Sequence, residues 1–242
     1  MILISIISVF IVNVYAGDFK AYESFNTILE NYVDSSGMVS YKGIRENPYS
    51  FSEYFDFIAN VSPRSHPSSF KSRADEMAYW INAYNALTIK IMLDNPKANS
   101  ILDISSFLIF KKRFIVGGEK MSLNKIEHKI LRKDFQDPRI HFAINCASLS
   151  CPPLGNRIFL GETLDQQLDE QTRNFITNMA NVKIDHNDKV IYLNKIFKWF
   201  AKDFNDVRSF VSKYLSDKES YNIIKDYRIK YFDYDWSLND SK

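Results

Sequence analysis

Two cysteines and a histidine lie close together in the segment DPRIHFAINCASLSCPPL, which spans residues 137–154. Cys146 and Cys151 are the only cysteines of the chain, and His141 precedes them by a few residues. A thiol paired with an imidazole can act as a nucleophile in acyl transfer, two thiols can form a disulfide, and cysteine together with histidine can bind a metal. The segment therefore allows a catalytic thiol, a disulfide or a metal site.

A metal site is disfavoured because the rest of the chain does not supply its ligands. Beside the two cysteines it would need a third and a fourth ligand. His66 and His186 lie in polar segments, and the sequence has no second paired-ligand motif. We therefore expect neither a metal nor another cofactor.

A disulfide between Cys146 and Cys151 is the structural alternative to a catalytic thiol. Residues 1–16 are an apolar stretch without charges and end in small residues, which fits a signal peptide cleaved after Ala16. Because no lysine or arginine precedes the apolar residues, an uncleaved membrane anchor is the other interpretation, although the stretch is short for a bilayer. We expect an exported protein, periplasmic or secreted, in which disulfides are allowed. A bridge that closes so short a loop would contribute only on the order of 2 kcal/mol.

The composition favours a globular protein that does not bind nucleic acid. The chain has 242 residues and a formal net charge of +2, with positive and negative residues interspersed, whereas nucleic acid calls for a broad basic surface. We expect one domain over residues 17–242, with a helical arm at about residues 17–61 and no membrane span once the signal is removed. Its partner would be a small-molecule or peptide substrate, and the oligomeric state stays open.

Residues 75–94 are apolar nearly all round, which predicts a helix that is buried on most sides. Asn82 and Asn85 share one face of this helix and must find hydrogen-bond partners inside the protein. They either join the helix to a neighbouring loop or support an active site.

A buried carboxylate is predicted in the segment that follows a hairpin at residues 114–121. Ser122 is a good N-cap for a helix over residues 122–135, and Glu127 falls in the middle of its apolar stripe, whereas His128 lies at the edge. Because an unpaired buried charge is costly, Glu127 either has a structural partner or orients a catalytic histidine. His128 is either structural or a substitute base.

Residues 139–145 alternate between apolar and polar side chains, which predicts a strand that ends just before Cys146. The small residues that follow suit a tight turn, where backbone N–H groups favour a thiolate and could hold an oxyanion. Strand parity would point His141 away from Cys146, so only the turn after Asn145 could bring the two together. Asn145 and Ser148 are candidate supporting residues.

The whole pattern predicts an α+β fold that is rich in helix and has a small, mainly antiparallel sheet. Further helices are expected over residues 164–176 and after Asn194, which can serve as a cap. Short strands are expected at residues 114–116, 139–145, 182–185, 190–193 and 229–233.

Several separated motifs resemble the bacterial and plant family of unknown function named DUF547. They occur in order at residues 80–87 (WINAYNAL), 122–128 (SLNKIEH), 137–153, 193–200 (LNKIFKWF) and 234–236 (YDW). The resemblance runs from about Tyr32 to the C-terminus. The positions that match the pattern of the family are Asn82, Asn85, Glu127, His128, His141, Cys146 and Cys151. A similarity to papain-like thiol hydrolases would be an analogy at the level of the fold alone.

Two function classes remain open. The first is an exported thiol-dependent hydrolase or acyltransferase. Its roles would be Cys146 as nucleophile, His141 as base, Glu127 as orienting carboxylate and His128 as substitute base, with Asn82, Asn85, Asn145, Ser148 and Cys151 in support. The enzyme requires a histidine nitrogen within about 4 Å of the Cys146 sulfur and Glu127 near the other ring nitrogen. The second class is a non-catalytic binding or envelope-structural module whose cysteines form a disulfide.

Overall fold

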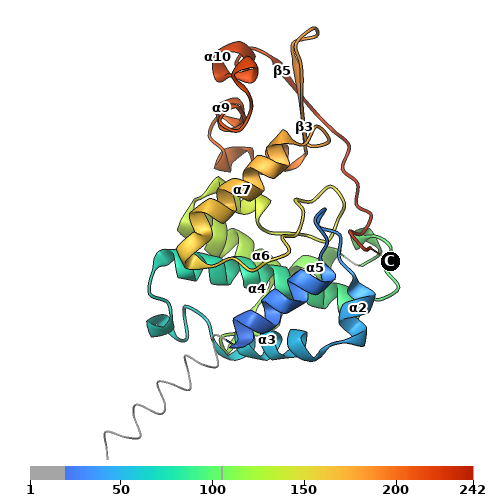
Figure 1. The fold of residues 1–242 in the computed structure, drawn as a ribbon, viewed down its shortest axis with the longest axis vertical. Helices are drawn as coiled ribbons and strands as arrows, with labels where there is room; N and C mark the ends of the chain where they lie inside the picture. The colour runs from blue at the N-terminus through green and yellow to red at the C-terminus, as the bar shows by residue number, and fades with distance from the viewer. Residues whose placement is uncertain (1–19, 105, 242) are drawn as a thin grey trace, which may run out of the picture.

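Helices form most of the protein, and Figure 1 shows them in a broad lower body beneath a narrower upper part. The computed structural model describes residues 20–104 and 106–241. The predicted signal peptide lies outside these residues. Over the residues described, no helix is both long and apolar enough to span a bilayer.

The lower body is built around α4 (Arg73–Asp94), which confirms the predicted buried helix. Ser72 begins it: its side chain accepts from the Asp75 backbone, and the Asp75 side chain accepts from the Ser72 backbone. The other helical segments of this body are residues 20–32, α2 (Tyr41–Glu46), α3 (Tyr49–Asn60), η1 (Pro67–Ser69), η2 (Ile101–Asp103) and α5 (Ser106–Lys111). The helical arm belongs to this body, since its buried side chains share one hydrophobic core with α4.

The predicted hairpin consists of β1 (Phe114–Val116) and β2 (Glu119–Met121), which pair antiparallel. Gly117 and Gly118 form its turn with φ angles of 56° and 78°, a backbone conformation that glycine adopts without strain. Ser122 then caps α6 (Leu123–Lys125), as predicted.

The helix after α6 continues as η3 (Ile126–Phe135), which is a π-helix and not the α-helix that the spacing predicts. Its apolar stripe is buried as expected, and Glu127 within that stripe is only 6% exposed. Long π-helices are rare, and π-helical turns are often found at functional sites. The helix that carries Glu127 and His128 is therefore the first structural sign of a site.

The predicted strand at residues 139–145 is wrong. The chain forms the 3-10 helix η4 (Pro138–Phe142), and the Asp137 side chain accepts from the Arg139 backbone at its start. A proline in the first turn after a capping aspartate starts a helix, and this local signal overrides the alternation of apolar residues. Strand parity therefore does not govern the direction in which His141 points.

The upper part contains the second sheet, whose order is β3-β4-β5. β3 (Val182–Asp185) pairs antiparallel with β4 (Val190–Leu193), and β4 pairs parallel with β5 (Arg228–Tyr231). The other elements are η5 (Gly161–Thr163), α7 (Leu164–Thr177), α8 (Ile196–Trp199), η6 (Ala201–Asp203), α9 (Val207–Ser212), η7 (Asp217–Glu219) and α10 (Tyr221–Ile224). The α+β class is thus confirmed, with two small sheets in place of the single one expected.

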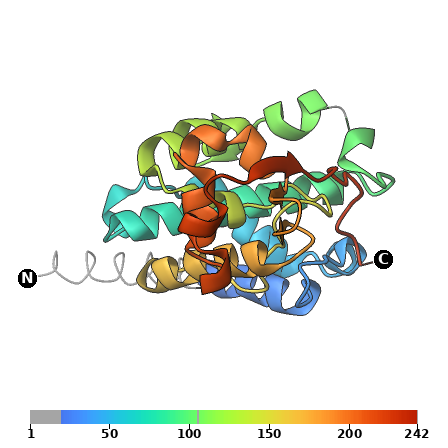
Figure 2. The same ribbon diagram turned by 90° about the horizontal axis from the view of Figure 1, so that it is seen from above.

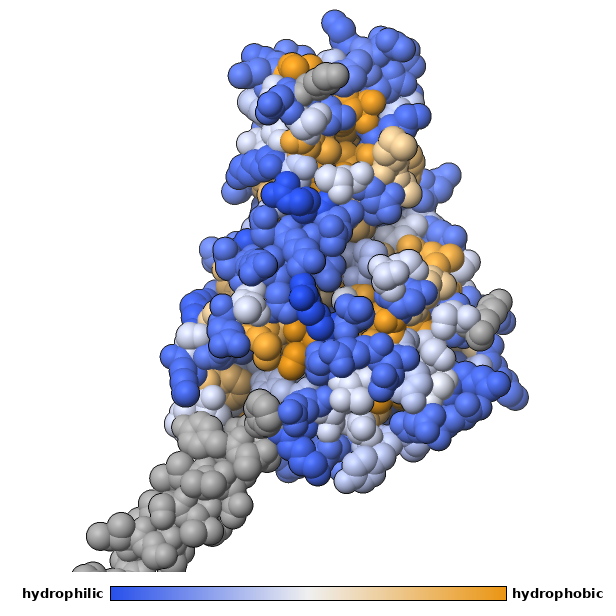
Figure 3. Space-filling model, viewed as in Figure 1, coloured by the Kyte–Doolittle hydropathy of each residue, from blue (hydrophilic) through white to orange (hydrophobic). Residues whose placement is uncertain are grey.

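The buried side chains form two hydrophobic clusters. The larger surrounds α4, whereas the smaller joins α7, α8 and the second sheet and includes Phe142 of η4. Figure 3 shows that hydrophilic residues cover most of one face, with hydrophobic side chains visible in the upper part and in a band below it. Because η4 contributes Phe142 to one cluster and Ile140 to the other, the segment before Cys146 lies where the two clusters meet.

The C-terminal segment returns from the upper part to the lower body, and Figures 1 and 2 show it running down one side of the molecule. Isolated bridges join Ser148 to Leu238 and Val39 to Asp240. The hydroxyl of Tyr41 donates to Asn239 Oδ1 at 2.7 Å. These contacts fix the chain near the two cysteines.

Candidate functional site

A pocket of about 190 Å³ lies between the lower body and the upper part. Its lining is mostly apolar and aromatic, and one of its lining residues, Trp199, is 46% exposed, so the pocket reaches the surface. The residues that line it are Tyr84, Phe110, Glu127, His141, Ile144, Cys146, Cys151, Pro152, Ile196, Trp199, Phe200, Tyr234 and Trp236. Four residues predicted from the sequence, Glu127, His141, Cys146 and Cys151, therefore meet at one cavity.

Cys146, Ser148, Cys151 and Tyr234 form what we call the thiol cluster. The Cys146 Sγ lies 3.2 Å from Ser148 Oγ and 3.5 Å from the Tyr234 hydroxyl, and Ser148 Oγ donates to that hydroxyl at 3.1 Å. The Cys146 backbone N–H donates to Cys151 Sγ at 2.9 Å. Both cysteines are free thiols here, Cys146 partly exposed and Cys151 only 8% exposed.

The turn that carries Cys146 is held by two asparagines. Asn85 Oδ1 accepts from the Asn145 backbone at 2.9 Å, and Asn85 Nδ2 donates to the Ala143 carbonyl at 2.9 Å. Asn145 in turn accepts from the Ala147 backbone at 2.7 Å and donates to the Pro152 carbonyl at 2.8 Å. Ala147 has a φ of 65°, so these side-chain bonds stabilise a backbone conformation that alanine rarely adopts.

The two thiols differ in acidity. A hydrogen bond from Cys151 is the main reason why the pKa of the Cys146 thiol falls to about 6, with burial opposing the shift and Ser148 and Tyr234 adding to it. Burial raises the pKa of the Cys151 thiol well above its ordinary value. At neutral pH Cys146 is therefore mainly a thiolate and Cys151 a thiol.

Glu127 reaches the same pocket from η3. The Tyr84 hydroxyl donates to its Oε2 at 3.3 Å. Burial raises the pKa of Glu127 to about 7, and the hydrogen bond from Tyr84 and the charge of Arg132 only partly oppose this rise. A carboxyl group with this pKa can both donate and accept a proton at neutral pH.

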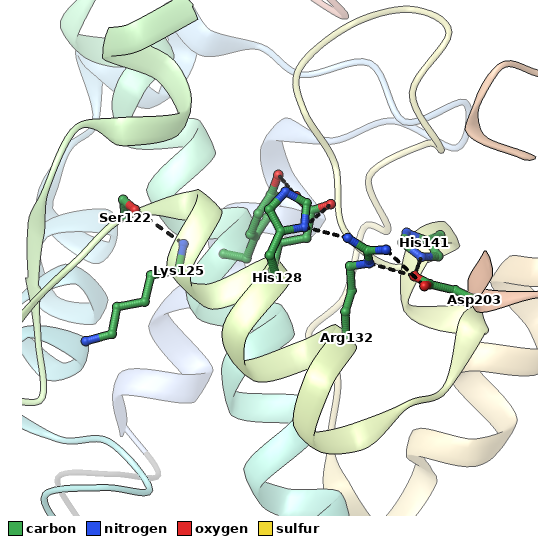
Figure 4. Close-up of polar contacts among 8 residues, drawn as sticks. Ser122, Lys125, His128, Arg132, His141 and Asp203 are labelled. Atoms are coloured by element: carbon green, nitrogen blue, oxygen red, sulfur yellow. Dashed lines mark hydrogen bonds and ion pairs between the residues drawn. The ribbon is translucent and has the colours of Figure 1, made fainter. Parts of the chain in front are cut away.

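His128, Arg132, His141 and Asp203 form the histidine cluster, which Figure 4 shows with Arg132 between His128 and Asp203. Arg132 donates to Asp203 through Nε at 2.6 Å and Nη2 at 2.9 Å. His141 Nε2 lies 2.7 Å from Asp203 Oδ2. Arg132 Nη1 donates to His128 Nδ1 at 2.9 Å, so this ring nitrogen acts as an acceptor.

The charges in the histidine cluster are paired. Burial lowers the pKa of His141, although its hydrogen bond to Asp203 raises it, and burial together with the charge of Arg132 lowers the pKa of His128. Burial alone would raise the pKa of Asp203, but hydrogen bonds from His141 and Arg132 hold it well below its ordinary value. At neutral pH the cluster is an ion pair beside two neutral imidazoles.

The geometry within the pocket differs from the arrangement that the enzyme hypothesis required. Over the described residues, the Cys146 sulfur interacts with the side chains of Ser148, Tyr234 and Cys151 and is hydrogen-bonded to neither imidazole. The carboxylate bound to His141 is Asp203, whereas Glu127 Oε1 lies 3.8 Å from His128 Nδ1. The sulfur and the imidazole of His141 thus share a cavity without a direct bond.

The two buried asparagines of α4 have separate roles. Asn82 donates to the Phe159 carbonyl at 2.8 Å and accepts from the Phe159 backbone at 2.9 Å, so it joins α4 to a loop. Asn85 binds the segment before Cys146 in the same two-sided way. Asn82 therefore fits the structural alternative, and Asn85 fits the supporting one.

Four residues that form hydrogen bonds within the site were not predicted as site residues: Tyr84, Arg132, Asp203 and Tyr234. Tyr84 is in the motif WINAYNAL, where it looks like a core aromatic residue, and Tyr234 is in the motif YDW. Asp203 is the last residue of the short helix η6 and carries no local signal, since its partners Arg132 and His141 are distant in the chain. The motifs at residues 193–200 and 234–236 both pointed to this side of the site.

Comparison of the chain with known protein families agrees with the sequence motifs. The model of the family described as "Protein of unknown function, DUF547" matches residues 67–176, a range that contains α4, η3 and both cysteines. No curated protein and no solved structure matches the chain. Asp203 and Tyr234 lie beyond the matched range. The resemblance seen in the motifs is confirmed for this range: residues 67–176 of the chain belong to the DUF547 family.

Proposed function

We propose that this protein is an exported thiol-dependent hydrolase or acyltransferase in which Cys146 is the nucleophile. One observation carries the proposal: a thiol whose pKa is lowered to about 6 and a carboxyl group whose pKa is raised to about 7 line the same surface-reaching pocket. Groups with such shifted pKa values in one cleft are typical of active sites. A purely structural cysteine has no need of a thiolate.

The two groups suffice for both halves of an acyl transfer. In the first half the Cys146 thiolate attacks the acyl carbon, and the leaving group departs with the proton of protonated Glu127. In the second half water attacks the thioester, ionised Glu127 accepts its proton, and Cys146 leaves as a thiolate. An alcohol or amine in place of water gives acyl transfer.

His141 is the second group that can exchange a proton at the pocket. Its Nε2 is held by Asp203, which leaves Nδ1 as the nitrogen that acts as a base in the neutral ring. The orienting carboxylate in this proposal is therefore Asp203, and Glu127 takes a direct part in proton exchange. His128, which binds Arg132, is a structural residue in this scheme.

The pocket favours a small apolar acyl group. Its volume of about 190 Å³ is below the range of roughly 300–1,000 Å³ that is usual for drug-sized ligands. Aromatic side chains dominate the walls toward the upper part, among them Trp199, Phe200 and Trp236. Esters or thioesters of short or aromatic acids fit this lining better than charged substrates do.

The test uses p-nitrophenyl esters of acetate, butyrate and benzoate with the purified, reduced protein. We expect turnover, an acyl adduct on Cys146 in intact-mass spectrometry, and loss of both in Cys146→Ser. Cys151→Ala is the matched variant: it removes the hydrogen bond that lowers the pKa of Cys146, so the acid limb of its pH profile should move to higher pH. Equal turnover by the wild type and Cys146→Ser would contradict the enzyme and favour the disulfide-stapled binding or envelope-structural module.

Export is part of the proposal and depends on the sequence of residues 1–16. The mature protein should begin at Gly17 and be recovered from the periplasm or the medium. N-terminal sequencing of the protein expressed with its own N-terminus tests this. A protein that keeps Met1 and stays with the membrane fraction would support an uncleaved anchor instead.

A further inference from the structure

We propose that Cys146 and Cys151 also form a dithiol–disulfide redox pair that exchanges with low-molecular-weight disulfides at the pocket. This activity goes beyond acyl transfer and requires no acyl substrate. It uses the second thiol, which the hydrolase needs only as a hydrogen-bond donor. The Cys146 sulfur would then be the nucleophile in two reactions, acyl transfer and thiol–disulfide exchange.

The geometry places the sulfur of Cys151 against the backbone of Cys146. Cys151 Sγ accepts a hydrogen bond from the backbone N–H of Cys146 at 2.9 Å, and interaction with the Cys151 thiol is the main cause of the lowered pKa of Cys146. Only residues 147–150 separate the two cysteines, and both line the same pocket. The turn between them is held by Asn145, which binds the chain on both of its sides. We therefore expect that the two side chains can form a disulfide without unfolding this turn.

The two thiols have the asymmetry that thiol–disulfide exchange requires. Cys146 is the more exposed and the more acidic, so it is the thiol that attacks an incoming disulfide. Cys151 is buried and stays protonated, which keeps it from competing for the first attack. It is placed to resolve a mixed disulfide that forms at its neighbour.

The exchange balances in two steps. The Cys146 thiolate attacks one sulfur of a small disulfide RSSR, which forms a mixed disulfide and releases one thiolate RS⁻. Cys151 then loses its proton and attacks Cys146 Sγ, which closes the Cys146–Cys151 disulfide and releases the second thiolate. RSSR gains two electrons, and the dithiol loses two electrons and a proton. A small dithiol drives the same steps in reverse.

Glu127 supplies the proton acceptor for the second step. Its carboxyl lines the pocket with both thiols, and its pKa of about 7 lets it be ionised in part of the molecules at neutral pH. Once Cys146 is in a mixed disulfide its negative charge is gone, and this charge is one cause of the raised pKa of Glu127. The carboxylate is therefore more readily ionised when Cys151 must lose its proton.

The size of the pocket selects the partner. Tyr234, Trp199 and Trp236 pack against one another beside it, with ring centroids between 4.4 and 5.6 Å apart. We expect a pocket of about 190 Å³ with this aromatic lining to admit a small disulfide and to exclude a disulfide within a folded protein. We therefore expect exchange with small aromatic or aliphatic disulfides.

The test uses 4,4′-dithiodipyridine, a small uncharged aromatic disulfide whose released thiol is followed by its absorbance as the thiopyridone. The reduced wild-type protein should release two equivalents of thiopyridone and keep none, because Cys151 closes the disulfide. Cys151→Ser should release one equivalent and keep one as an adduct on Cys146. Cys146→Ser should react at least tenfold more slowly. A wild-type protein that keeps the reagent on either cysteine would overturn the proposal.

A second variant separates the redox pair from a chance reaction of neighbouring thiols. Glu127→Gln should lower the ratio of the second release rate to the first at least fivefold at pH 7. Equal slowing of both steps would show that Glu127 is not the proton acceptor for Cys151 in the second step. Because this assay needs no ester, a protein without esterase activity that gives the predicted stoichiometry would overturn the hydrolase and keep the redox pair.

Discussion

The thiol cluster and the histidine cluster lie at one site, but their buried charges are stabilised in different ways. In the histidine cluster the charge of Arg132 is paired with that of Asp203, and the imidazoles stay neutral. In the thiol cluster the charge on Cys146 is stabilised by thiol and hydroxyl donors. Paired charges resist a change of protonation, whereas the thiol and the nearby Glu127 change theirs close to neutral pH. We therefore expect the main proton and thiol chemistry at Cys146 and Glu127, whereas the ion pair of the histidine cluster holds His141 in place.

Glu127→Gln gives the largest change in stability that the comparison predicts. A carboxyl group whose pKa rises to about 7 on folding costs stability as the pH rises past its unfolded pKa, and the full cost is present above pH 7. Converted at 1.36 kcal/mol per pKa unit, the cost is about 3 kcal/mol. Glu127→Gln should therefore unfold at a higher temperature than the wild type at pH 8 and at nearly the same temperature at pH 4.

Calorimetry at these two pH values checks this, with Glu119→Gln on the exposed β2 as the matched control. A Glu127→Gln variant that is less stable than the wild type at pH 8 would mean that the carboxylate has a stabilising partner. The contrast between the two clusters would then not hold for Glu127, because its buried charge would be paired.

Asp203→Asn should have the opposite sign and a smaller size. Its carboxylate is held ionised in the folded protein, so its contribution is present above the unfolded pKa and is lost as the pH falls through the folded one. Hydrogen bonds to charged groups contribute roughly 1.5–3 kcal/mol, and the group is partly exposed, so we expect a loss of about 2 kcal/mol at pH 7. Urea denaturation measures it, and a loss as large at pH 2 as at pH 7 would contradict the ion pair.

Tyr84→Phe should have the smallest effect, about 1 kcal/mol or less. It removes one hydrogen bond that lowers the pKa of Glu127, so this pKa should rise further. NMR titration of the Glu127 carboxyl carbon in the variant and the wild type gives both values. A pKa that falls in Tyr84→Phe would show that the tyrosine does not donate to the carboxylate.

The sequence predicts the scaffold of this site better than its contacts. Residues 75–94 and 164–176 have apolar spacing over several turns, and the hairpin has a pair of glycines, so α4, α7 and β1-β2 are predictable. Glu127 is predictable as a buried carboxylate because its helix is apolar on both sides of it. Periodicity does not reveal that this helix is a π-helix.

Other features depend on tertiary contacts that no local pattern encodes. The segment at residues 139–145 has the alternation of a strand, but Asn85 takes the place of a neighbouring strand by binding Ala143 and Asn145. Asp203 meets His141 only because η6 folds back over η4. The pairing of β4 with β5 joins segments that are far apart in the chain.

The pH dependence of alkylation at Cys146 shows whether this sulfur is a thiolate at neutral pH, as the proposed chemistry requires. The reduced protein is treated with iodoacetamide between pH 4 and pH 10, and the labelling rate of each cysteine is followed by peptide mass spectrometry. We expect a Cys146 rate that is half its maximum near pH 6, with Cys151 unlabelled until far higher pH. A midpoint for Cys146 near the ordinary thiol pKa of about 8.5, or equal labelling of both cysteines, would contradict it.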